Sequence, residues 1–290
     1  RKMNRKSLGS DKVFDVVVMA VTGVIAFLFL LPLINVLASS FSSADEIVAG
    51  NVGLFPVKFT LDGYRNILKN KQIWQGFKNS LLYTLIGTVI QVTCQMLCAY
   101  PLSRKDFKGR SFLNLMLTLT MFISGGMIPS YLLITQLKMY DTIWAVILPG
   151  CISVFNIIII RTYMSNSIPY ELNEAAMLDG CGDWKLFVKI ILPLSRPILL
   201  VMILYAIVGY WNSYFNALMY VQTTSKLPLQ NVINNILISN ESSLGSGMDV
   251  NAAQQLKYVT IVVSSLPLLL IYPFFQKYFE KGVTIGGLKG

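Results

Sequence analysis

Six long stretches of this 290-residue chain contain no Asp, Glu, Lys or Arg. About 20 apolar residues in a helix cross the hydrocarbon of a bilayer, and each stretch is long enough to do so. Lipid offers no partner to an unpaired backbone amide, and the alternation of a barrel strand is absent, so each span is expected to be helical. The uncharged stretches are residues 16–44, 79–103, 111–137, 142–160, 197–225 and 258–276.

The composition supports an all-α polytopic membrane protein with six transmembrane helices. Hydrophobic residues make up 54% of the chain and charged residues only 13%, against about 25% charged in soluble domains. The first span is longer than the apolar region of a secretory signal and lacks a convincing cleavage site, which favours an uncleaved helix. We expect a single transmembrane domain over residues 1–290, with spans at 14–38, 79–101, 111–133, 142–160, 197–221 and 258–278, an internal loop at 161–196 and external loops at 39–78 and 222–257.

The basic residues predict the orientation. Lys and Arg are enriched on the cytoplasmic side of short loops, and 16 of the 24 fall on one side if the N-terminus is cytoplasmic. Both termini are therefore predicted to lie in the cytoplasm. The net charge of +10 is then mostly a topology signal, and no motif or aromatic–basic interleaving supports binding to nucleic acid.

Two features that catalysis and ATP binding commonly use are absent. The chain has no His, which removes the usual general base and the usual zinc ligand. It also lacks the G-x-x-x-x-G-K-[ST] loop that cradles ATP phosphates, so any ATP must be hydrolysed by a partner. Nothing ligand-like accompanies the cysteines, and we expect small packing residues in preference to a metal site or a disulfide. The four cysteines are Cys94, Cys98, Cys151 and Cys181.

The internal loop predicts two short helices on the cytoplasmic face. Pro169 and Glu171 suit a helix start, and Gly180 is placed to end that helix with a left-handed residue. Asp183 is expected to cap a second helix over residues 184–191, which Pro193 closes.

A spaced motif lies across these two helices. Paired alanines let another backbone approach closely, and Glu174 adds one directional acidic contact. The alternative is an ordinary solvated connector whose acids face water, but the simultaneous spacings favour a docking surface. The motif consists of Glu174-Ala175-Ala176, then Gly180, then Ile190, Leu192 and Pro193.

This spacing resembles the E-A-A loop of the membrane-spanning subunits of ABC importers. The whole chain resembles the inner-membrane permease subunits of binding-protein-dependent carbohydrate importers of the maltose-transporter type. Further similarities are Asn79-Ser80, Trp211-Asn212, Pro193 with Pro197, and the tail at residues 281–290.

The resemblance implies the type I importer fold in the bacterial cytoplasmic membrane, surrounded by lipid. It implies a second homologous permease, two ABC ATPase subunits that bind ATP and Mg, and an extracytoplasmic protein that delivers a sugar, with an oligosaccharide as the narrower expectation. ATP and the loaded binding protein would favour the same outward-facing state, and so would reinforce each other.

The resemblance also implies roles for residues at matching positions. The ATPase-docking residues would be Glu174, Ala175, Ala176, Asp179 and Gly180. An ATPase-interface tail would contain Gly286, Gly287 and Lys289, although a frayed terminus is the alternative.

Two external features have weaker support. Residues 227–240 predict an interfacial helix too short to span. It leads to a polar segment that would either contact the binding protein or form an ordinary surface loop. The candidate contact residues in this segment are Asn240, Glu241, Ser242, Ser243 and Gly245. Candidates for the sugar path, which could equally be interface anchors or helix-joining groups, are Tyr205, Tyr210, Trp211, Asn212, Tyr214 and Asn216.

Glycine and proline pairs weaken two spans, at Gly125-Gly126 with Pro129 and at Pro149-Gly150. They could be hinges or static kinks. A secondary transporter would be expected to show acids or bases in the span interiors or an inverted repeat, and neither is visible. A membrane hydrolase would need a polar catalytic pair at depth, and the span interiors contain no His, Asp or Glu. An importer of polyamine, phosphate or metal would carry the same E-A-A loop and remains open.

Overall fold

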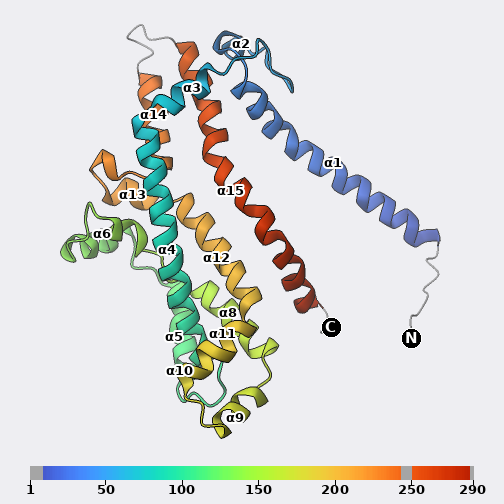
Figure 1. The fold of residues 1–290 in the computed structure, drawn as a ribbon, viewed down its shortest axis with the longest axis vertical. Coiled ribbons are helices and arrows are strands. Elements are labelled where there is room, and N and C mark those ends of the chain that lie inside the picture. The colour runs from blue at the N-terminus through green and yellow to red at the C-terminus, as the bar shows by residue number, and fades with distance from the viewer. Residues whose placement is uncertain (1–8, 243–249, 288–290) are drawn as a thin grey trace. The chain divides into compact units, whose positions relative to one another are not determined.

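The computed structural model describes residues 9–242 and 250–287, and these ranges are helical with no strand (Figure 1). Within them, three helical segments are long and apolar enough to cross a membrane: Lys12–Ser40, Lys71–Ser103 and Gln254–Gln276. Two bent helix pairs raise the number to five if each pair is one span. The all-helical prediction is confirmed, whereas the count of six transmembrane helices stays a prediction.

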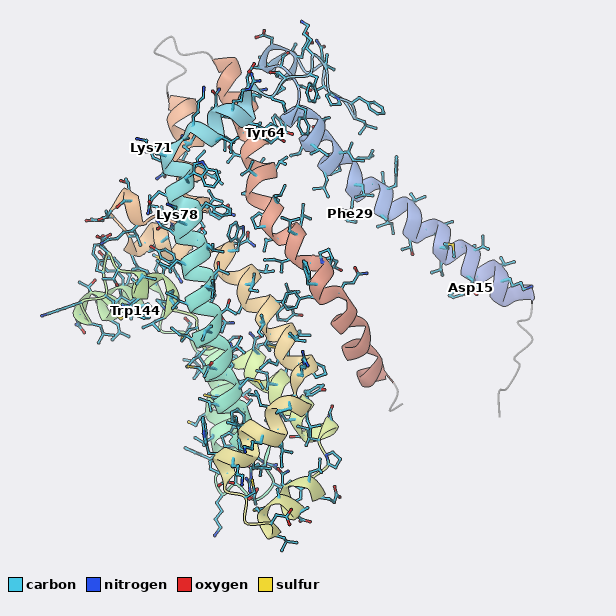
Figure 2. The ribbon with its side chains drawn as sticks, in the orientation of Figure 1. Asp15, Phe29, Tyr64, Lys71, Lys78 and Trp144 are labelled. Carbon is cyan, nitrogen blue, oxygen red and sulfur yellow. The ribbon has the colours of Figure 1, made fainter. Side chains whose placement is uncertain are left out.

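The first of two compact units comprises the described residues of Arg1–Asn70 and Ile236–Ser265. Its helix α1 (Gly9–Ser40) is apolar, and none of its most apolar window is buried against the chain. The side chain of Phe29 accordingly projects into open surroundings (Figure 2). The short helices α2 (Ala44–Val48) and α3 (Asp62–Lys69) follow.

Helix α15 (Val250–Gly287) contributes its first part to this unit. Gly63 of α3 lies so close to it that an added Cβ would stand 2.8 Å from the Val259 side chain. The amide of Gln255 donates a hydrogen bond to the carbonyl of Ser42 at 2.9 Å. Small side chains and a buried hydrogen bond thus hold the two segments together.

The second unit comprises Lys71–Asn235 and the described residues of Leu266–Gly290. Helix α4 (Lys71–Ser103) packs beside α8 (Val154–Ser167) and α12 (Arg196–Trp211) (Figure 1). Gly87 of α4 lies under the ring of Tyr210, where a Cβ would come within 2.6 Å of the ring. The Tyr210 hydroxyl donates to the carbonyl of Ile147 in α7 (Ile143–Ile147) at 3.0 Å.

The predicted third, fourth and fifth spans are not continuous helices. Helices α5 (Arg110–Phe122) and α6 (Met127–Gln136) meet at 111°, and α7 is separated from α8 by residues 148–153. Gly126 (φ 86°) and Gly150 (φ 84°) adopt the left-handed region at these breaks. Glycine adopts it without a Cβ clash, so the two weak points seen in the sequence are where the helices stop.

The fifth span breaks between α12 and α13 (Phe215–Tyr220). The carbonyl of Val208 at the end of α12 accepts from both the side-chain amide of Asn212, at 3.0 Å, and the backbone N–H of Asn212, at 3.2 Å. Tyr220 of α13 is buried with Ile134 of α6 and Ala145 of α7. The broken ends are therefore packed together.

The remaining helices lie in the loops. The loop at residues 161–196, which was predicted to be internal, is the cytoplasmic-type loop. It contains α9 (Glu171–Leu178), α10 (Asp183–Leu186), a π-helical turn (Phe187–Ile191) and α11 (Leu192–Leu194). A 3-10 turn (Thr224–Lys226) and α14 (Leu229–Ser242) follow α13, which confirms the helix predicted at residues 227–240.

Candidate functional site

Helix α9 carries the Glu-Ala-Ala triplet and ends as the sequence predicts. Gly180 adopts a φ of 70°, and its N–H donates to the carbonyl of Met177 at 3.0 Å. The N–H of Cys181 donates to the carbonyl of Ala176 at 2.9 Å. These bonds satisfy carbonyls that a helix end otherwise leaves free, and the predicted left-handed residue is confirmed.

The motif residues differ in exposure. Glu174, Ala175, Asp179 and Gly180 are exposed, whereas Ala176 is only 7% exposed. The methyl group of Ala176 packs against the chain itself, and the role of this residue in docking stays a prediction. Within the part of the chain that the structure describes, the Glu174 side chain makes no hydrogen bond or ion pair.

Two large apolar side chains next to the motif are also exposed. Leu178 is 89% exposed and Trp184 is 68% exposed. Apolar groups in a charged loop are uncommon on a free surface and mark contact sites when they cluster. We did not single them out from the sequence, although their apolar character amid charged neighbours was the available signal.

The second helix differs from its prediction in two ways. Asp183 does not cap α10, because Gly182 is the residue before the helix and the Asp183 carboxylate instead accepts a hydrogen bond from Arg104. Pro193 does not close the helix either. It lies within the first two residues of α11, where its missing N–H is tolerated, and the helical path ends only at Ser195.

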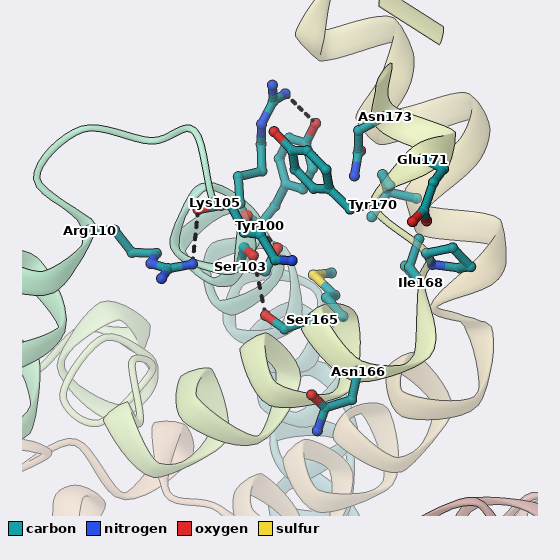
Figure 3. Close-up of a pocket in the computed structure, with 14 residues that line it drawn as sticks. Tyr100, Ser103, Lys105, Arg110, Ser165, Asn166, Ile168, Tyr170, Glu171 and Asn173 are labelled. Atoms are coloured by element: carbon teal, nitrogen blue, oxygen red, sulfur yellow. Dashed lines mark hydrogen bonds between the residues drawn. The ribbon is translucent and has the colours of Figure 1, made fainter. Parts of the chain in front are cut away.

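A cavity of about 360 Å³ opens between this loop and the end of α4 (Figure 3). Tyr100 and Ser103 line one side of it, while Glu171 and Asn173 line the other. The Ser165 hydroxyl donates to the carbonyl of Ser103 at 3.2 Å. Asn173 is 7% exposed, and its Oδ1 has no hydrogen-bond partner in the described chain.

The candidate sugar-path residues differ in exposure. Tyr210 and Trp211 are buried, at 7% and 3% exposure, and the Trp211 ring meets Phe77 edge-on at 5.5 Å. Tyr205 is 48% exposed and Asn212 is also exposed.

Tyr214 and Asn216 have structural partners. The Tyr214 hydroxyl accepts from the amide of Asn234 at 2.8 Å. The Asn216 amide donates to the carbonyls of Val146 and Pro149. Most of the side chains predicted to contact sugar in the fifth span therefore make hydrogen bonds or ring contacts within the chain itself.

The Asn79-Ser80 pair has a clear structural role at the other end of α4. The Asn79 amide donates to the carbonyls of Ser225 and Leu227, at 2.8 and 2.9 Å. The Ser80 hydroxyl accepts from the N–H of Leu229 at 2.8 Å. This pair anchors the turn between α13 and α14.

The remaining candidates are described incompletely. Gly286 and Gly287 lie at the end of α15, and Lys289 lies outside the described residues. Asn240, Glu241 and Ser242 form the end of α14, whereas Ser243 and Gly245 are outside the described residues. Among side chains that the structure does describe, no group of three or more His, Cys, Asp or Glu could hold a metal.

Comparison with known proteins gives a consistent result. Residues 7–285 match the family described as the binding-protein-dependent transport system inner membrane component. The chain is 38% identical over 285 residues to the polygalacturonan/rhamnogalacturonan transport system permease protein YtcP of Bacillus subtilis, covering 97% of this chain and 99% of the relative. It is 30% identical to the arabinooligosaccharides transport system permease protein AraQ of Halalkalibacterium halodurans, covering 92% and 93% of the two chains.

A solved structure agrees in fold. The crystal structure of a bacterial ABC transporter involved in the import of the acidic polysaccharide alginate contains a chain with a TM-score of 0.85 and 29% identity. That match covers 94% of this chain and 98% of the other.

Proposed function

The chain belongs to the family of inner membrane components of binding-protein-dependent transport systems, and from that premise we propose that it is the permease subunit of an ATP-driven importer of oligosaccharides. It is a multi-pass protein of the inner membrane. With a second permease it would form the path through which a sugar crosses after delivery by an extracytoplasmic binding protein.

The exposed end of α9 is the observation that carries this proposal. Glu174 presents a carboxylate without a hydrogen bond or ion pair in the described chain, and Leu178 beside it is 89% exposed. A short helix with one directional charge and an uncovered apolar residue suits insertion into a cleft of another protein. We propose that the partner is an ABC ATPase, one per permease, which binds ATP and Mg because this chain lacks a phosphate-binding loop.

The relatives' names support the substrate class. Those proteins are named for polygalacturonan or rhamnogalacturonan and for arabinooligosaccharides, and the matching solved transporter imports alginate. We propose an oligosaccharide as substrate, with the exposed Tyr205 and Asn212 as its remaining candidate contacts in this chain.

Three further assignments belong to the same proposal. Both termini would be cytoplasmic. The tail with Gly286, Gly287 and Lys289 would reach the ATPase interface, and residues 240–245 would contact the binding protein.

The test is a hydrolysis assay on the complex purified with its native membrane neighbours in mild detergent. We expect binding proteins loaded with a polysaccharide-derived oligosaccharide to stimulate ATP hydrolysis, and unloaded ones to stimulate it less. The absence of any co-purifying ATPase would overturn the proposal.

A matched pair of variants tests the docking surface. Glu174 and Glu171 are both exposed acids in the first turn of α9. Glu174→Ala should weaken ATPase attachment by about tenfold, the loss expected for one charge-assisted contact, whereas Glu171→Ala should change it little. Equal effects of the two substitutions would contradict the assignment of Glu174.

A further inference from the structure

The guanidinium of Arg104 connects the end of α4 to both helices of the cytoplasmic-type loop. Arg104 directly follows α4 and is only 9% exposed. Its Nη1 donates to the Asp183 carboxylate at the start of α10, and its Nη2 contacts the sulfur of Met177 in α9 at 3.7 Å.

The same guanidinium also binds two residues close to it in the chain, Asp106 and Tyr100. Nε donates to Oδ1 of Asp106 at 2.9 Å, and Nη1 donates to the Tyr100 hydroxyl at 3.1 Å. Nη2 donates to the second oxygen of Asp106. Each of the three guanidinium nitrogens thus donates at least one hydrogen bond. The planar guanidinium, with its five N–H donors, can make these bonds at the same time.

The electrostatics favour a charged cluster in this position. The hydrogen bonds to Asp106 raise the pKa of Arg104, and the guanidinium lowers the pKa of Asp106. The Asp183 side chain is 78% exposed, so Arg104 is the contact that orients it. Without the guanidinium, two carboxylates would face each other across the gap between the loops.

Neighbouring contacts reinforce this connection. The Tyr100 ring lies 5.0 Å from the ring of Phe187 in the π-helical turn, and the Lys105 ammonium lies 5.5 Å from the centre of the Tyr170 ring. The Arg110 guanidinium donates to the Arg104 carbonyl at 3.3 Å (Figure 3). Ring contacts, however, tolerate sliding, whereas the ion pairs of Arg104 fix direction.

Helix α4 can carry a displacement over a long distance. Its 33 residues span roughly 50 Å at the rise of an α-helix. At its far end Asn79 and Tyr83 hold the turn at residues 225–229. A shift of α9 and α10 that moves α4 would therefore reach the opposite side of the chain.

We propose that Arg104 is the positioning residue through which α9, α10 and α4 move together, so that movement of the docked ATPase reaches the transmembrane helices. This inference rests on the proposed function. It assigns Arg104 to transmission of movement and leaves ATPase attachment to the exposed residues of α9.

The first experiment uses the purified chain alone, in detergent, and measures amide hydrogen exchange. Arg104→Met should speed exchange of residues 171–186 by about tenfold, because local opening is no longer opposed by the ion pairs. Arg104→Lys, which keeps the charge without the fork, should give a smaller increase. Lys108→Met removes an exposed charge from the same loop and should leave exchange unchanged. Unchanged exchange in Arg104→Met would overturn the proposal.

The second experiment uses the assembled transporter. Complexes with Arg104→Met should retain their ATPases but lose the stimulation of hydrolysis by loaded binding protein, while Lys108→Met complexes should behave as wild type. Normal stimulation, or loss of the ATPases from the Arg104→Met complex, would overturn the role in transmission. If wild-type complexes show no stimulation, the proposed function is wrong. The exchange measurement on the chain alone then still tests whether Arg104 holds residues 171–186 in place.

Discussion

Asp141 shows how one carboxylate can fix an irregular turn. Its oxygens accept hydrogen bonds from the N–H groups of Gln222 and Thr223, at 3.0 and 2.9 Å, and from the Thr223 hydroxyl. The Lys226 ammonium lies 2.7 Å from it. Asp141 itself has a φ of 55°, a left-handed conformation that costs about 1–2 kcal/mol, so these contacts must hold the turn in place.

Replacing this carboxylate should destabilise the protein. Asp141→Asn keeps the shape but removes the ion pair and one acceptor, and we expect a loss of about 1–2 kcal/mol after solvent screening of the exposed Lys226. Asp62→Asn is the matched control, because the Asp62–Arg65 pair at 3.4 Å is exposed on both sides and should contribute little. Thermal unfolding in detergent at pH 7 measures both, and equal midpoint shifts would contradict this role of Asp141.

The same variant should show a defined pH dependence. Hydrogen bonds from Lys226 and Thr223 hold the pKa of Asp141 below its ordinary value. A carboxyl group with a lowered folded-state pKa stabilises the protein above its unfolded pKa, about 3.9, and loses that effect as pH falls through the folded value. The difference between wild type and Asp141→Asn should be constant from about pH 8 to pH 5 and shrink only in stronger acid.

At the scale of elements, the contact between α4 and α12 depends on one missing side chain. Gly87 leaves room for the Tyr210 ring, and a Cβ there would meet three ring atoms at 2.6 to 2.7 Å. The ring is also held by its hydroxyl, which is bonded to the Ile147 carbonyl. The ring therefore cannot move aside without breaking a buried hydrogen bond.

Gly87→Ala should force these two helices apart and lower the stability of the protein. We expect a loss of about 1–3 kcal/mol, the usual effect of overpacking. Gly209→Ala in α12 is the control, since nothing lies within 4 Å of its added Cβ, and it should be neutral or stabilising by up to about 1 kcal/mol. The measurement is the unfolding midpoint of each variant in the same detergent, and a stable Gly87→Ala protein would show that the two helices can move apart freely.

At the scale of the whole molecule, the sequence predicted features that depend on local chemistry. The helical character of the spans, the left-handed Gly180, the ends of α9 and the helix α14 all follow from residues close in the chain. The family and its inner-membrane location followed from the E-A-A spacing and are confirmed by the comparisons.

Features that depend on distant partners could not be predicted in this way. Asp183 was expected to cap a helix, but Arg104 lies 79 positions away in the chain and takes its carboxylate. The burial of Ala176 could not be predicted either, because it depends on how α9 packs. Tyr210 and Trp211 likewise became interior groups because Gly87 and Phe77 of α4 receive their rings.

The number of membrane crossings is the largest whole-molecule prediction that remains. Reporter fusions can count the crossings, because alkaline phosphatase is active only outside the cytoplasm. Six crossings place phosphatase joined after residues 51, 138 and 240 outside, where it is active, and after residues 109, 180 and 290 inside, where it is inactive. Green fluorescent protein at the same six positions should show the opposite pattern.

The bent pair α5 and α6 makes residue 138 the decisive position. If the 111° bend turns the chain back, phosphatase after residue 138 will be inactive and the third span does not cross. The positive residues favour a crossing, since Arg104, Lys105 and Lys108 precede α5 and Arg110 begins it, whereas only Lys138 follows α6 before the next apolar segment. An active phosphatase after residue 290 would instead place the C-terminus outside, away from any ATPase, and would contradict the proposed contact of the tail with that subunit.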